Sequence, residues 1–155
     1  MQNHFDNQYM QLALEQANKA YAEKEIPVGC IIVQPAEQRI LAQSHNMSEQ
    51  GLNPNLHAEM MAIDLACQKL QRKNLSDCEM YVTLEPCVMC ASAISNSRIK
   101  SLYYGALDRK QGAIENGIRF FTQKCCFHKP EVYSALSELQ SAKLMKKFFV
   151  DLRKK

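Results

Sequence analysis

The chain has 155 residues, of which 46% are hydrophobic, and this length favours one domain with a proper core and leaves no room for a second domain. Its formal net charge is +3, and its seven cysteines are an odd number. Its N-terminus lacks the pattern of a basic segment followed by an apolar segment that is typical of a secretion signal, and its apolar runs are far shorter than a membrane span. We therefore expect one domain over residues 1–155 in a reducing cytoplasm, with no disulfides and no membrane anchor.

The periodicity of the first half alternates between helix and strand, which indicates the α/β class. A first helix is predicted over about residues 9–23. A buried strand follows at residues 27–33, and a turn at residues 35–38 leads into a second strand near residues 39–44. These two strands are predicted to form a hairpin.

The second half continues the alternation. A helix is predicted from about His57 through Cys67, because Asn53, Pro54 and Asn55 are typical helix start signals. The remaining predicted elements are a strand at residues 80–84, a helix that begins near Pro86, a strand at residues 99–104, and a last helix at about residues 134–153.

The strongest functional signal is a pair of motifs, H-x-E at His57 and Glu59, and P-C-x-x-C at Pro86, Cys87 and Cys90, with 26 residues between Glu59 and Pro86. One His and two Cys supply three ligands, which is typical of a catalytic zinc site, because four protein ligands normally close a structural site. Glu59 is then the candidate proton carrier for the water at the open position, whose pKa zinc lowers to about 7. This combination is the general pattern of zinc-dependent nucleobase deaminases.

The spacing of the ligands explains their positions. Cys87 and Cys90 are three residues apart, so on a helix they share one face and can bind one ion. Pro86 suits a first helical turn, and a helix N-terminus favours the thiolate form that binds metal. His57 also opens a predicted helix, so two helix N-termini are expected to converge on the zinc.

Two other interpretations of the cysteines stay open. A structural zinc site would need a fourth ligand, and the segment with Cys125, Cys126 and His128 offers the only such candidate elsewhere in the chain. Alternatively, Cys87 and Cys90 could be a redox dithiol.

The positive charge is concentrated at the C-terminus. Residues 143–155 hold six basic side chains and one acidic side chain, a net +5, so the other 142 residues carry −2. Basic clusters neutralise phosphates and release counterions, which suits RNA better than a free nucleoside. The alternative is a solvated helix end whose basic residues complement the helix dipole.

The chain resembles the bacterial tRNA-specific adenosine deaminases, within the cytidine deaminase-like superfamily, over nearly its whole length. Beyond the zinc motifs, the resemblance rests on the segments IPVG at residues 26–29, YVTLEPCVMC at residues 81–90 and YGALDRKQGA at residues 104–113. It implies a three-layer α/β/α fold with a five-stranded mixed sheet, one Zn²⁺ per chain, and a homodimer whose interface helps to shape the substrate groove.

The resemblance also implies the substrate contacts. Asn46 matches the asparagine that contacts the bound nucleoside, and the positions along the RNA-binding groove match Asp108, Lys110, Phe149 and Arg153. For each of these residues the alternative is an ordinary surface or core role, above all for Phe149 on an amphipathic helix.

The expected reaction is hydrolytic deamination of adenosine to inosine at the wobble position of a tRNA anticodon loop. The alternatives are a small-molecule deaminase acting on guanine or cytosine nucleosides and nucleotides, and a non-enzymatic zinc or RNA-binding module, against which the intact Glu59 argues.

Val88 replaces a proline frequent in guanine deaminases, and His57 replaces the cysteine of small tetrameric cytidine deaminases. One departure is Asn55-Leu56, where the resembled family usually has Thr-Ala, because a larger Leu56 could reshape the pocket.

Overall fold

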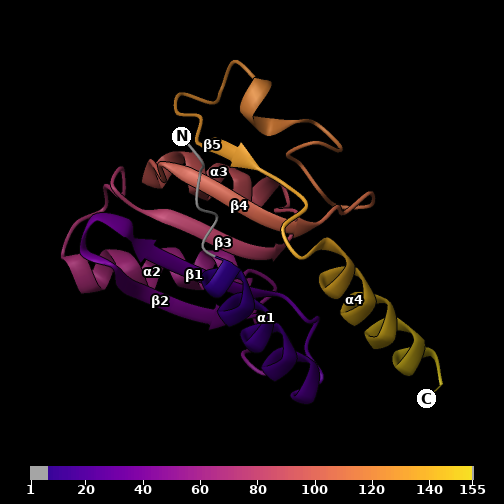
Figure 1. Cartoon of the computed structure of the whole chain (residues 1–155). Coiled ribbons are helices and arrows are strands. Elements are labelled where there is room, and N and C mark those ends of the chain that lie inside the picture. The colour runs from indigo at the N-terminus through magenta and orange to yellow at the C-terminus, as the bar shows by residue number, and fades with distance from the viewer. Residues whose placement is uncertain (1–6, 155) are drawn as a thin grey trace.

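The computed structural model describes residues 7–154 (Figure 1). Its helices and strands alternate as the sequence predicts. In chain order they are α1 (Asn7–Ala22), β1 (Gly29–Gln34), β2 (Arg39–His45), α2 (Ala58–Leu70), β3 (Glu79–Leu84), α3 (Val88–Ser97), β4 (Ser101–Ala106), β5 (Glu131–Tyr133) and α4 (Glu138–Arg153), with short 3₁₀ turns at Pro35–Glu37 and Phe120–Thr122.

The strands form one mixed sheet in the order β2-β1-β3-β4-β5. β1 runs antiparallel to both β2 and β3, whereas β3, β4 and β5 are mutually parallel. The predicted hairpin between the first two strands is therefore confirmed, as is the five-stranded mixed sheet that the resemblance implied.

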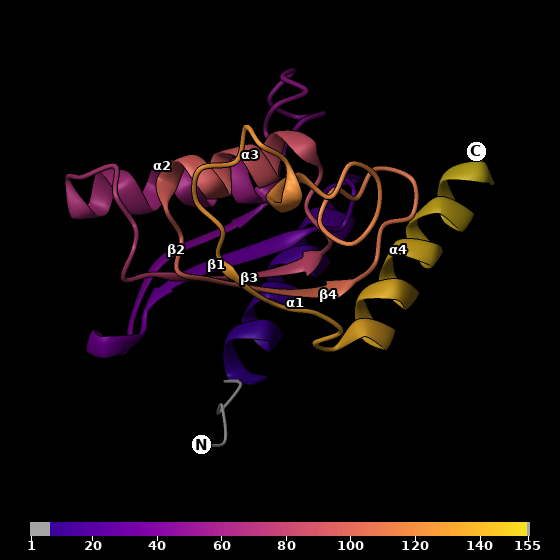
Figure 2. The ribbon, with the colours of Figure 1, turned by 90° about the horizontal axis from the view of Figure 1, so that it is seen from above.

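Helices cover both faces of this sheet, which gives the three-layer α/β/α arrangement (Figure 2). Successive strand residues point to opposite faces. Cys30 and Ile32 pack in the cluster that includes α2 and α3, whereas Ile31 and Val33 pack with α1. The strands β1 and β4 are consequently buried along their whole length.

Helix α4 lies on the same face as α1. Tyr104 of β4 packs in the cluster that includes α2 and α3. The next residue, Gly105, points to the opposite face of the sheet and therefore faces the α1 layer. A Cβ at Gly105 would come within 2.5 Å of the Ser141 Oγ, so only glycine allows α4 to approach the sheet this closely. The far end of α4 is tied to α1, because the Tyr21 hydroxyl donates a hydrogen bond to Asp151.

The last third of the chain departs most from the predicted elements. The sequence predicts a helix from residue 134, but α4 begins at Glu138, because Ala135 and Ser137 have positive φ angles of 65° and 53° and cannot continue a helix. The three residues of β5 had no recognisable pattern in the sequence. The strand predicted at residues 99–104 lies at Ser101–Ala106, where it pairs in parallel with Glu79–Leu84.

Both motif helices start where the sequence predicts. His57 is the N-cap of α2 and Cys87 is the N-cap of α3. Within residues 7–154, no helix combines the length and the apolar character needed to cross a membrane. All seven cysteines are free thiols.

Candidate active site

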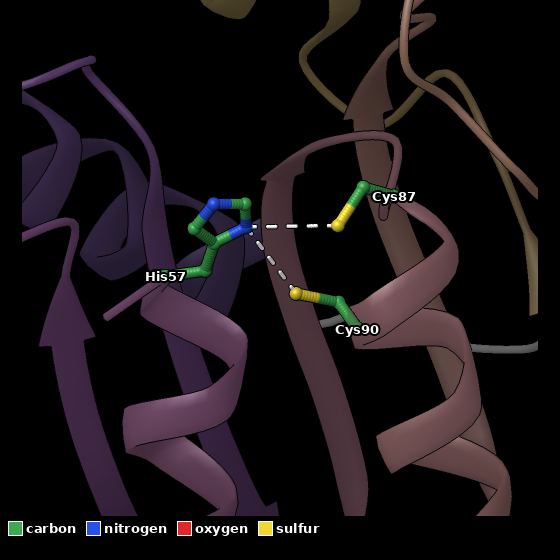
Figure 3. Close-up of side chains that lie close together, drawn as sticks. All are labelled: His57, Cys87 and Cys90. Carbon is green, nitrogen blue, oxygen red and sulfur yellow. Dashed lines mark hydrogen bonds between the residues drawn. The ribbon is translucent and has the colours of Figure 1, made fainter. Parts of the chain in front are cut away.

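The two helix N-termini bring three metal-ligating side chains together (Figure 3). The His57 Nδ1 atom lies 3.6 Å from the Cys87 Sγ and 3.6 Å from the Cys90 Sγ. A tetrahedral zinc ion with bonds of about 2.1 Å to nitrogen and about 2.3 Å to sulfur holds these atoms about 3.6 Å apart. The donor set of His57, Cys87 and Cys90, hereafter the metal cluster, therefore fits one zinc ion per chain without rearrangement.

The candidate fourth ligands lie elsewhere. Cys125 is exposed, and the Cys126 thiol contacts the carbonyl oxygen of His128 at 3.1 Å. The His128 Nε2 atom contacts the carbonyl oxygen of Ile99 at 2.7 Å. Within the part of the chain that the structure describes, the metal cluster comprises three residues, which is the ligand number of a catalytic zinc site.

The cysteines of the metal cluster share a hydrogen bond that makes one of them acidic. The hydrogen bond from Cys90 lowers the pKa of the Cys87 thiol to about 4, against the effect of burial and with the help of His57 and the Cys90 backbone N–H. The same hydrogen bond, together with burial, raises the pKa of Cys90. Cys87 is therefore a thiolate at neutral pH, the form that binds metal.

Glu59 occupies the first turn of α2, two residues beyond His57, and its side chain is only 4% exposed. Burial raises its pKa above the ordinary value for a glutamate, although a backbone hydrogen bond and its hydrogen bond with Cys90 act in the opposite direction. A buried carboxylate beside a metal cluster is placed to take and return a proton.

The metal cluster opens into a cavity of about 350 Å³, within the size range of small-molecule sites. Of the residues that the sequence singled out, the cavity is lined by His57, Glu59, Cys87, Asn46, Asp108, Lys110 and Phe149. Its other walls are formed by Ile26, Val28, Leu84, Glu85, Gln111 and Met145. Arg153 does not line it; the Arg153 Nε donates to the carbonyl oxygen of Phe149 at 3.2 Å, within its own helix.

Asn46 is buried and its orientation is fixed. Its Oδ1 accepts the backbone N–H of Ala58 at 2.9 Å, which satisfies one of the free donors at the start of α2. Among the described residues its side-chain nitrogen has no hydrogen-bond partner. The amide N–H groups therefore remain available to a ligand in the cavity.

Leu56, where the chain departs from the pattern of the resembled family, is not a wall of the cavity. It packs against Gly51, because a Cβ at Gly51 would lie 2.2 Å from the Leu56 Cδ1 atom. The larger side chain is therefore accommodated by the loop between β2 and α2, outside the set of residues that line the cavity.

Comparison with known proteins agrees with this geometry. Residues 3–106 match the family model of the cytidine and deoxycytidylate deaminase zinc-binding region. The chain is 50% identical over 144 residues to a tRNA-specific adenosine deaminase of Rickettsia bellii, covering 93% of this chain and 99% of that protein. A tRNA-specific adenosine deaminase of Agrobacterium fabrum is 45% identical, and the match covers 94% of each chain.

The chain belongs to the tRNA-specific adenosine deaminase family. A solved structure from work on A-to-I editing by tRNA:A34 deaminases at the wobble position of transfer RNA has a TM-score of 0.85 and 45% identity, and the match covers 88% of this chain and 98% of that chain. A guanine deaminase of Nitrosomonas europaea has a TM-score of 0.81 at 21% identity, covering 93% of this chain and 84% of that chain, and this likeness shows the fold alone.

One residue of this deaminase that the motif analysis missed is Glu85. It is 2% exposed, and its carboxylate accepts hydrogen bonds from the loop that follows β4. Burial alone would raise its pKa, but the hydrogen bonds from the backbone and side chain of Asn116 and from other loop N–H groups bring it below the ordinary value. The signal in the sequence is that Glu85 is the only charged residue between Glu79 and Arg98.

One basic residue of α4 in this deaminase packs against α1. The Lys147 Nζ lies over the Tyr21 ring, 4.9 Å from its centroid, so this lysine packs toward α1. Phe149 and Met145 line the cavity instead. The structure therefore places Lys147 of the basic tail on the α1 side of α4, and Lys155 lies outside the described residues.

Proposed function

We propose that this protein converts adenosine to inosine at the wobble position of a tRNA anticodon loop. The observation that carries the proposal is the position of Glu59 beside a three-residue metal cluster at the inner end of an accessible cavity. The names of relatives that are 45% and 50% identical over more than nine-tenths of the chain support adenosine in tRNA as the substrate.

His57, Cys87 and Cys90 would hold the zinc ion. When bound, zinc lowers the pKa of a water molecule to about 7, so that attack on C6 of adenine can occur at neutral pH. Glu59 takes one proton from the attacking water and delivers it to N1 of the ring, and then takes the remaining proton of the added hydroxyl and delivers it to the leaving amine. The C6–N bond breaks and a C6–O bond forms, so that adenosine and water give inosine and ammonia.

The cavity has suitable walls for a single purine. Val28, Leu84 and Met145 offer apolar surface to the faces of the ring, and the amide of Asn46 offers hydrogen-bond donors beside Glu59. A base within an RNA stack cannot reach Glu59, so the adenosine must turn out of a single-stranded loop.

The outer part of the cavity suits the nucleotides around the target base. Lys110 is exposed at the rim and can neutralise a phosphate, while Phe149, 40% exposed, can stack on a base. Arg153 follows Phe149 by one turn of α4 and extends this surface. We propose these residues and Asp108 as RNA contacts. We also propose that residues 1–155 form a single domain and that two such chains form a homodimer. The enzyme would act in the cytoplasm, where tRNA is found.

The proposal is tested with four substrates: an anticodon stem-loop with a wobble adenosine, free adenosine, cytidine and guanine. We expect inosine to form from the stem-loop, and free adenosine to react slower by orders of magnitude, because it lacks the flanking nucleotides that align the base. The same stem-loop with guanosine at the wobble position is the control. Ammonia release from guanine or cytidine at a rate equal to that from the stem-loop would favour the small-molecule deaminase instead.

A further inference from the structure

The carboxylate of Glu85 organises the loop that forms the outer wall of the cavity. Its Oε1 accepts the backbone N–H groups of Ile114, Glu115 and Asn116 at 3.1, 2.8 and 2.9 Å. Its Oε2 accepts the backbone N–H of Asp108 at 2.9 Å and the Asn116 side-chain amide at 2.7 Å. Five donors thus converge on one buried side chain.

The loop packs closely around this carboxylate. A Cβ at Gly112 would lie 2.5 Å from the Glu85 Cδ and 2.3 Å from the carbonyl oxygen of Asp108, so no larger residue fits here without a shift. Gly112 also forms a β-bridge with Cys87, and the Ala113 N–H donates to the carbonyl oxygen of Pro86 at 2.9 Å. The loop is therefore attached to the same segment that supplies two metal ligands.

The hydrogen bond at Asp108 fixes the start of the loop. The Asp108 Oδ1 in turn accepts the backbone N–H groups of Lys110 and Gln111, each at 3.0 Å. A chain of hydrogen bonds thus runs from Glu85 through Asp108 to Lys110, and the last two residues line the cavity.

Glu85 also touches the cavity, but donors already occupy both of its oxygens. A carboxylate in this condition is a poor proton carrier, since accepting a proton would break at least one of the five hydrogen bonds. Glu59, which is buried and lines the cavity beside the metal cluster, remains the proton carrier.

We propose that Glu85 is a positioning residue for substrate binding, which holds Asp108 and Lys110 at a set distance from the metal cluster so that the flanking nucleotides and the target base are aligned together. This inference rests on the proposed function for the identity of the substrate. It assigns Glu85 no contact with the reacting atoms.

The variant Glu85→Gln tests the proposal because it replaces one acceptor oxygen by an NH₂ donor. The orientation of the glutamine that keeps the most hydrogen bonds places its oxygen toward the three N–H groups of Ile114, Glu115 and Asn116. Its NH₂ group then occupies the Oε2 position. The Asn116 amide can rotate to accept from this NH₂, but the Asp108 N–H cannot. The substitution therefore releases Asp108 in particular.

We expect Glu85→Gln to raise KM and Kd for the adenosine stem-loop about tenfold, the size expected when the binding loop loses a charge-assisted hydrogen bond, and to change kcat less than about threefold. Zinc content should stay at one ion per chain. Amide hydrogen exchange at Asp108, followed by NMR, should become faster. Asn116→Ala is the matched control, because it removes one hydrogen bond to Glu85 and leaves the Asp108 bond in place, so its KM should stay near that of the wild type.

Two results would overturn the proposal. One is an unchanged Kd for RNA in Glu85→Gln while the Asp108 amide exchanges faster, and the other is an equal increase of KM in Asn116→Ala, which would indicate general destabilisation. If Glu85→Gln does not fold, Gly112→Ala displaces the carboxylate sterically and should raise KM in the same way; a normal KM in that variant contradicts the proposal. A wild-type protein that binds the stem-loop but forms no inosine would instead contradict the proposed function alone.

Discussion

The Asn46 Oδ1 accepts the backbone N–H of Ala58, the residue between His57 and Glu59. One side chain therefore both stabilises the start of α2 and fixes the amide group that faces the cavity. The hydrogen bond to the oxygen holds the amide in one orientation, in which Asn46 offers N–H donors that suit an acceptor atom on the substrate.

This division of roles can be tested by two substitutions at Asn46. Asn46→Ala removes both groups and should lower kcat/KM for the adenosine stem-loop by at least about tenfold and lower the free energy of unfolding by about 1 kcal/mol. Asn46→Asp keeps an acceptor for the Ala58 N–H and should restore stability but not activity. Thermal unfolding, zinc content and initial rates measure these effects; full activity in Asn46→Asp would show that the N–H donors do not bind the substrate.

A second prediction concerns Glu59. Glu59→Gln should keep one zinc ion per chain and reduce turnover by about 10² or more, because the proton carrier is lost while every metal ligand remains. Asp64→Asn, an exposed carboxylate farther along α2, is the matched control and should turn over at the wild-type rate. A Glu59→Gln enzyme with near-normal kcat would mean that another group moves the proton.

The metal content should distinguish the cysteines. Cys87→Ala and Cys90→Ala should each lower zinc below one ion per chain and lower Tm, because a three-residue site loses a ligand. Cys126→Ala should retain zinc and activity, since Cys126 contacts His128 instead of the metal cluster. Elemental analysis of the purified variants provides the measurement, and loss of zinc from Cys126→Ala would restore the structural-site interpretation.

The lysines should differ in their effect on RNA binding. Lys110→Gln removes a charge at the rim of the cavity and should reduce the slope of log K against log salt by about 0.7, the value for one lost phosphate contact with a single strand. Lys147→Gln removes the contact over Tyr21 and should lower Tm with little change in that slope. Binding titrations at several salt concentrations test both variants, and equal slopes for Lys110→Gln and the wild type would remove Lys110 from the RNA surface.

The metal ligands could be predicted from the sequence because their geometry is local. Cys87 and Cys90 need only one turn of α3 to share a face, and His57 needs only the start of α2. The role of Glu85 could not be predicted, because its partners lie 23 to 31 positions along the chain in a loop without periodicity. A hydrogen bond of that kind depends on how the loop folds back over β3.

The end of α4 was harder to predict for a similar reason. A helical pattern predicts which residues share a face, but the direction of that face is set by tertiary contacts such as Tyr21 with Asp151. Phe149 consequently lines the cavity, while Arg153 lies one turn beyond its edge. The resemblance placed both residues along one RNA-binding groove, and for both of them this role stays a prediction.

The match to the shared zinc-binding region ends at residue 106, which is also the last residue of β4. His57, Glu59, Cys87 and Cys90 precede this boundary, whereas Asp108, Lys110, Met145 and Phe149 follow it. The metal ligands and the proposed proton carrier thus lie within the segment that matches the family model, and part of the cavity wall comes from residues after it. Substitutions after residue 106 can therefore change the cavity walls at Asp108, Lys110, Met145 and Phe149 without replacing a metal ligand.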